Sequence, residues 1–187
     1  MKTLLRHIPN ILSGLRLMAA PVVALLILKG YDGAALGVFA FAGLSDALDG
    51  YLAKTFSFTS EFGAMLDPAA DKLLMVSSYV ALSEVGAVPW WLTATVIGRD
   101  VAIVSGIAMA KTVNAPLKVA PLLVGKASTV VQICYVTAIL LMLALDARMP
   151  IVRQIGNILV VTFAIGSLQA YARIWLKAVV TPTSKVG

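Results

Sequence analysis

Four aspartates lie in apolar segments of the chain, where a carboxylate is least expected. Asp46 and Asp49 are three positions apart in one segment, and Asp67 and Asp71 are four positions apart in the next. On a helix these spacings place the members of a pair about 60° and about 40° apart, and therefore on one face. A charged aspartate at the centre of a bilayer costs at least about 2.5–3.5 kcal/mol, so four of them point to a function.

The two segments follow one another in the chain, so the end of one helix and the start of the next can direct all four carboxylates into one pocket. Close negative charges repel one another unless cations lie between them. Ligation by oxygen alone favours Mg²⁺ or Mn²⁺, and we expect two such ions. Ions of this kind hold phosphate oxygens and activate a diphosphate for displacement.

Two other interpretations of the four aspartates stay open. They are structural ion pairs with Lys54, Lys72 or Arg99, or they form the ion site of a cation-coupled or proton-coupled transporter. The sequence shows no evident inverted repeat, which makes the transporter the less attractive of the two.

The chain that carries these aspartates is too apolar for a soluble domain. Of its 187 residues, 60% are hydrophobic and 13% are charged, whereas soluble proteins are about 25% charged. Apolar runs separated by charged residues, proline or glycine predict an all-α integral membrane protein with six transmembrane helices. The predicted spans are residues 9–29, 34–54, 63–84, 89–110, 119–145 and 151–177.

The net charge is +6, and we attribute it to basic loops that face anionic lipid headgroups. No basic stripe with interleaved aromatic residues supports nucleic-acid binding. Lysine and arginine are concentrated in the loops on the side of the N-terminus, which predicts that both termini face the cytoplasm. We expect residues 1–180 to form a single six-helix catalytic domain and residues 181–187 to be a polar tail.

A second set of charges also lies in the predicted spans. Arg99 precedes Asp100 in the fourth span, Lys126 lies in the fifth, and Arg16 is a further buried-charge candidate in the first. Cations that face a cavity are suited to bind the phosphate of a substrate. The alternative is that Arg99 and Lys126 are counter-charges for Asp100 and for the four aspartates.

Residues 46–71 resemble the signature of the CDP-alcohol phosphatidyltransferase family, which reads D-x2-D-G-x2-A-R-x8-G-x3-D-x3-D. Every spacing is matched by Asp46, Asp49, Gly50, Ala53, Lys54, Gly63, Asp67 and Asp71. One position departs, because Lys54 stands where the family usually has arginine. Lysine keeps the charge but lacks the planar fork of a guanidinium. The segment from Ile8 to Arg16, with Pro21 after it, is similar to the entry helix of the phosphatidylglycerol-phosphate and cardiolipin synthase branches.

This resemblance implies the CDP-alcohol phosphotransferase fold, six transmembrane helices and a homodimer. It also implies an enzyme that attacks a CDP-linked lipid with an alcohol and releases CMP. Asp46, Asp49 and Asp67 would ligate metal, and Asp71 would share the metal site and act as the catalytic base. Nucleotide binding would fall to Asp49, Gly50, Ala53, Lys54, Gly63 and Asp67. The phosphate of the acceptor would be bound by Arg99 and Lys126.

Two acceptors are compatible with the resemblance: phosphatidylglycerol, which gives cardiolipin, and glycerol 3-phosphate, which gives phosphatidylglycerol phosphate. Members that use glycerol 3-phosphate usually carry a second arginine two turns after the first, and here that position is Ile107. Residues 35–46 also look like the mitochondrial-type cardiolipin synthases. We therefore favour a cardiolipin synthase with CDP-diacylglycerol as donor. The lack of a long presequence predicts a bacterial inner membrane, with the active site on the cytoplasmic side.

Overall fold

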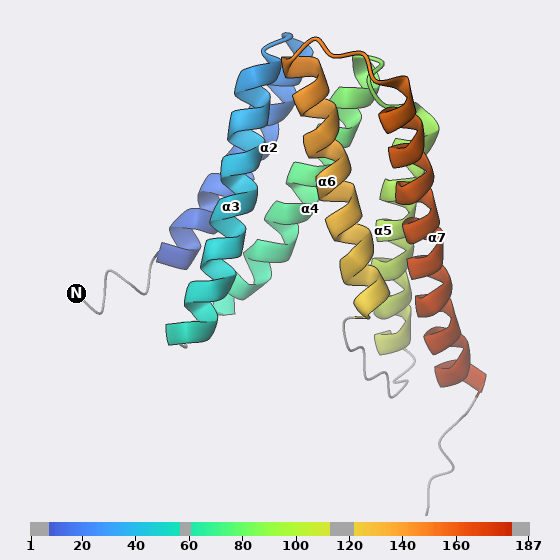
Figure 1. Cartoon of the computed structure of the whole chain (residues 1–187). Coiled ribbons are helices and arrows are strands. Elements are labelled where there is room, and N and C mark those ends of the chain that lie inside the picture. The colour runs from blue at the N-terminus through green and yellow to red at the C-terminus, as the bar shows by residue number, and fades with distance from the viewer. Residues whose placement is uncertain (1–7, 57–60, 113–121, 181–187) are drawn as a thin grey trace, which may run out of the picture. The chain divides into compact units, whose positions relative to one another are not determined.

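The computed structural model describes residues 8–56, 61–112 and 122–180, with side chains at residues 14–45, 69–109 and 122–175. In this part of the chain all regular structure is α-helical (Figure 1), which confirms the predicted all-α class. The helices are α2 (Ile8–Leu28), α3 (Asp32–Phe56), α4 (Glu61–Glu84), α5 (Trp90–Thr112), α6 (Leu123–Ala144) and α7 (Pro150–Val180). Each corresponds to one predicted span. The predicted start of the fifth span at residue 119 and the tail 181–187 lie outside the described residues.

Three helices end in the same kind of turn. After α2, the amide of Gly30 donates to the carbonyl of Ile27 and the amide of Tyr31 donates to that of Leu26. The same pair of hydrogen bonds closes α4 around Gly86 and α6 around Asp146, and all three central residues have a positive φ. Glycine adopts this conformation without strain, and aspartate is one of the few other residues that tolerate it. The three residues lie in gaps between the predicted spans, at 30–33, 85–88 and 146–150, and the helices end there as predicted.

Three of the described helices are long and apolar enough to cross a membrane: Trp90–Met109, Leu123–Ala144 and Pro150–Trp175. The apolar parts of α2 and α3, Gly14–Leu28 and Asp32–Ser45, are shorter. The prediction of an integral membrane protein is thus supported by three spans. Six spans, and the orientation with both termini in the cytoplasm, stay predictions.

The chain divides into two compact units, and each is described by itself. The first contains Met1–Trp90 and Val136–Met149, and in it α2 packs against α3 and α4. Figure 1 shows the chain passing along α2, returning along α3 and reversing again into α4. A hydrogen bond from Ser77 Oγ to the carbonyl oxygen of Ala20, 3.1 Å long, links α4 to α2. The prediction of one domain over residues 1–180 is not tested by this division.

The second unit contains Trp91–Tyr135 and Pro150–Gly187. Its helices approach closely where glycine faces an aromatic ring: Gly106 of α5 faces Trp175 of α7, and Gly156 of α7 faces Tyr135 of α6. A methyl group at either glycine would overlap the ring. Small residues that allow such close approach are characteristic of helix packing in membranes, where lipid gives no hydrophobic drive for helices to associate.

Candidate active site

The backbone places the four aspartates at matching depths in two consecutive helices. Asp46 lies ten positions before the end of α3 at Phe56, and Asp71 lies ten positions after the start of α4 at Glu61. At 1.5 Å of rise per residue, each is about 15 Å from the connection between the helices. Asp49 and Asp67 lie closer to the connection, at seven and six positions from the same two helix ends. The helical spacing expected within each pair is therefore present.

Most of the predicted metal and nucleotide side chains lie outside the described residues. The backbone of all these residues is helical, but the structure does not describe the side chains of Asp46, Asp49, Gly50, Ala53, Lys54, Gly63 and Asp67. Of the four aspartates, only Asp71 has a described side chain. Convergence of the four carboxylates on one pocket consequently stays a prediction.

Asp71 forms an ion pair with Arg16 of α2. Nη1 of Arg16 donates to Oδ1 of Asp71 at 2.7 Å, and the arginine side chain is 1% exposed while the aspartate side chain is 45% exposed. Both residues belong to the first unit. The sequence indicated Arg16 as a buried charge but did not indicate its partner. The counter-charges proposed for the aspartates were Lys54, Lys72 and Arg99, so Arg16 is a further counter-charge that the sequence analysis had not assigned to them.

Arg16 is buried because it stands on the packed face of α2. Ala20, Val23 and Ile27 follow it at intervals of four, three and four residues, and each is at most 1% exposed. This is the spacing of one helix face. Arg16 thus takes a position that an apolar residue would ordinarily fill, and burial of its charge is tolerable because a carboxylate accepts a hydrogen bond from it.

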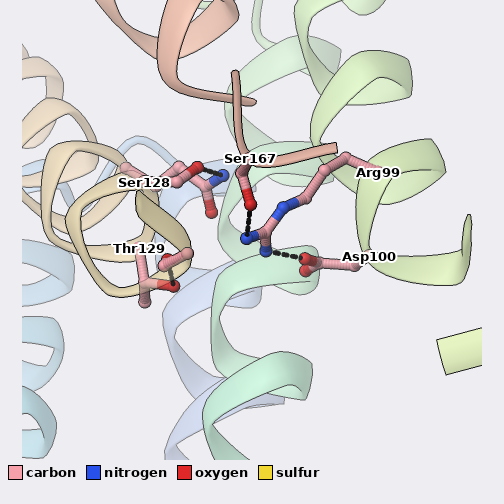
Figure 2. A network of polar contacts seen from close by, with 7 residues as sticks. Arg99, Asp100, Ser128, Thr129 and Ser167 are labelled. Carbon is pink, nitrogen blue, oxygen red and sulfur yellow. Dashed lines mark hydrogen bonds and ion pairs between the residues drawn. The ribbon is translucent and has the colours of Figure 1, made fainter. Parts of the chain in front are cut away.

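Arg99 is the centre of a polar network in the second unit (Figure 2). Its Nη1 donates to Oδ1 of Asp100 at 2.6 Å, and its Nη2 donates to Oγ of Ser167 in α7 at 2.5 Å. Arg99 is 7% exposed. Asp100 is therefore a counter-charge of Arg99, as the alternative interpretation of Arg99 proposed. The buried N–H of Nε has no acceptor among the described side chains.

Lys126 lies one position after the point where α6 approaches Arg99. A methyl group on Gly125 would stand 3.5 Å from Nη2 of Arg99 and 3.3 Å from the hydroxyl of Tyr171. Lys126 itself is exposed. The structure thus brings the backbone beside Lys126 close to Arg99, but it describes no bond between the two side chains. Their joint role in binding a phosphate stays a prediction.

Several polar residues near Arg99 were not predicted from the sequence. Ser128, Gln132 and Ser167 are each at most 1% exposed, and the amide of Gln132 donates to Ser128 at 3.4 Å. Figure 2 shows Ser128 and Thr129 on α6, with Ser167 reaching the guanidinium of Arg99 from α7. A signal was available for two of them, because Ser128 and Gln132 are four positions apart in an apolar run and so share a helix face.

Comparison with known proteins agrees with the aspartate spacing. The model of the CDP-alcohol phosphatidyltransferase family matches residues 6–181. The chain belongs to this family. The family's transferase chemistry favours the enzyme interpretation of the aspartates over the transporter.

Relatives within the family carry two different names. Cardiolipin synthases (CMP-forming) of Rattus norvegicus and Homo sapiens are each 38% identical over 147 residues, which is 70% of this chain and 49% of each relative. A Mycobacterium tuberculosis protein named "Probable phosphatidylglycerophosphate synthase" is 39% identical over 103 residues, or 52% of this chain and 49% of the relative. The chain spans about half the length of these curated relatives.

Proposed function

We propose that this protein is a cardiolipin synthase that transfers a phosphatidyl group from CDP-diacylglycerol to phosphatidylglycerol and releases CMP. The observation that carries the proposal is the family match over residues 6–181 together with the complete aspartate spacing on α3 and α4. The similarity to the rat and human enzymes over 70% of the chain supports the choice within the family. We further propose a homodimer in a bacterial inner membrane, with the site on the cytoplasmic side.

The donor set of the site fits a hard divalent cation. Asp46, Asp49, Asp67 and Asp71 offer only carboxylate oxygens, which are the ligands that Mg²⁺ and Mn²⁺ prefer. These four residues would hold two ions. When bound, the ions would neutralise the negative charge that develops on the diphosphate as CMP leaves.

The residues of the chain would then bind and orient the two substrates. Gly50, Ala53 and Gly63 would let the cytidine nucleotide approach the helix backbones closely, with Asp49, Lys54 and Asp67 around it. Asp71 would take the proton of the acceptor hydroxyl, whose oxygen forms a bond to the lipid-linked phosphorus. The bond from that phosphorus to the bridging oxygen breaks, and CMP carries the electron pair away. A positioned carboxylate helps because a free alcohol is a poor nucleophile at neutral pH.

The acceptor phosphate would be bound by Arg99 and Lys126. Arg99 already donates to Asp100 and Ser167, so fewer of its N–H groups are left for a substrate phosphate. A dianionic phosphate monoester needs more donors than the monoanionic diester of phosphatidylglycerol. The position of a second arginine is taken by Ile107 in α5. Both observations favour phosphatidylglycerol. Glycerol 3-phosphate is the second candidate, and the similarity to the mycobacterial protein supports it.

One competition experiment tests the proposal. The purified protein is reconstituted with CDP-diacylglycerol and Mn²⁺, and phosphatidylglycerol and glycerol 3-phosphate are supplied together. Mass spectrometry of the lipid product should show cardiolipin. Phosphatidylglycerol phosphate as the main product would move the assignment to the second candidate, and no CMP release with either acceptor would reject both.

A further inference from the structure

The ion pair between Arg16 and Asp71 is placed by helix packing. Ser77 of α4 donates to the carbonyl oxygen of Ala20 in α2, so the two helices are bonded at two levels. Residue numbers rise together at the two levels, from 16 to 20 and from 71 to 77, which means that α2 and α4 run in the same direction. The buried stripe that continues through Val23 and Ile27 prevents α2 from turning about its axis. The position of the guanidinium is therefore set by the core of the first unit.

The two members of the pair differ in their access to the surroundings. The side chain of Arg16 is 1% exposed, while that of Asp71 is 45% exposed. A charge-assisted hydrogen bond of 2.7 Å to a planar and buried donor is strong and directional. It restricts the side-chain rotation of Asp71 while much of the aspartate side chain stays accessible.

Stability alone does not account for an arginine at position 16. Buried ion pairs contribute little compared with well-packed apolar residues of similar volume, which are often as stable or more stable. The neighbouring positions of the stripe are Ala20, Val23 and Ile27, so the helix face is otherwise built for apolar contact. The charge at position 16 is bonded to Asp71, which is one of the four aspartates of the signature.

We propose that Arg16 is a positioning residue, which holds the carboxylate of Asp71 in the orientation that the transfer reaction requires. The inference rests on the proposed function. Arg16 acts through Asp71 and does not itself contact the reacting atoms. Displacing a reacting group by about 1 Å can lower a rate by about 100-fold, so a short, fixed link from the core to Asp71 has a direct effect on catalysis.

The test uses Arg16→Lys, because lysine keeps the charge but reaches one bond less far and lacks the planar fork. We expect kcat for CMP release to fall by about 10-fold to 100-fold while KM for CDP-diacylglycerol stays unchanged. Adding Asp71→Glu, which lengthens the partner by one bond, should recover part of the loss. The matched control is Arg153→Lys, since Arg153 is an exposed arginine in α7, and its kcat should equal that of the unmodified protein.

A second readout does not depend on turnover. Thermal unfolding of the same detergent-solubilised proteins is followed against Mn²⁺ concentration, and Arg16→Lys should need more Mn²⁺ for half of the stabilisation. If Arg16→Lys does not fold, Arg16→Met replaces it, because methionine suits the apolar stripe. Wild-type kcat together with a wild-type Mn²⁺ midpoint in the folded variant would overturn the positioning role. Absence of CMP release by the unmodified protein would instead reject the proposed function, and the Mn²⁺ midpoint would still decide the role of Arg16.

Discussion

Nη2 of Arg99 donates to the hydroxyl of Ser167, a residue 68 positions later in the chain, at 2.5 Å. Ser167 is fully buried and lies on a stripe of α7 with Val160 and Ala164, which are at most 1% exposed. A serine is thus placed at a core position of α7, where its hydroxyl accepts from a buried cation of α5. This bond fixes the guanidinium that we propose binds the acceptor.

Ser167→Ala should destabilise the protein, because a buried N–H of Arg99 loses its acceptor. The expected loss is about 1–3 kcal/mol, measured by unfolding in detergent. The control is Ser105→Ala: Ser105 is exposed and its hydroxyl donates to the carbonyl of Val101 in its own helix, so the change should stay within about 0.5 kcal/mol. Equal stability of the two variants would argue against the importance of the Arg99–Ser167 bond.

Asp67→Asn and Asp71→Asn should each lower CMP release by at least about 100-fold, because a metal ligand or the base is lost. The measurement is kcat at saturating Mn²⁺. Asp146→Asn serves as the control, since Asp146 lies in the exposed turn after α6 and asparagine tolerates the same backbone conformation. Turnover near the unmodified value in either signature variant would remove that residue from the mechanism.

Arg99→Ala and Lys126→Ala should raise KM for phosphatidylglycerol more than KM for CDP-diacylglycerol, because each removes a positive charge from the proposed acceptor site. Lys126 gives the clearer result, since it is exposed and its loss leaves no buried group unpaired. Lys29→Ala, at an exposed lysine after α2, controls for general loss of charge. A larger effect on the CDP-diacylglycerol KM would assign both residues to the donor side.

Gly156→Ala should destabilise the second unit, because its methyl group would overlap the ring of Tyr135. Overpacking of this kind costs about 1–3 kcal/mol. Gly37→Ala in α3 is the matched control, as its methyl group would meet open space and alanine favours a helix. Unfolding midpoints of both variants measure the difference, and no loss for Gly156→Ala would mean that the ring of Tyr135 moves aside at little cost.

Lys54→Arg should keep CMP release, because the family pattern has arginine at this position and the charge is unchanged. The comparison is kcat/KM for CDP-diacylglycerol in the two proteins. An inactive variant would show that the nucleotide pocket is shaped around the ammonium group of Lys54.

The sequence by itself was enough for the helical class, the breaks between helices in which Gly30, Gly86 and Asp146 lie, and the family. These features are local. An apolar run of sufficient length forms a helix whatever it packs against, a positive φ selects glycine or aspartate within a few residues, and the aspartate spacing is a property of one short stretch. For the same reason the arrangement of Asp46 and Asp71 at equal depths in their helices follows from counting residues.

Only the tertiary structure decided which polar groups are bonded to one another. Arg16 and Asp71 are 55 positions apart, and Arg99 and Ser167 are 68 positions apart. Hydropathy treats each of these residues as a polar interruption in an apolar helix, and periodicity shows which face it occupies but not which helix lies opposite. The partner is set by the rotation and register of packed helices, which depend on contacts summed along their whole length. That is why Arg16 was recognisable as a buried charge while its connection to Asp71 was not.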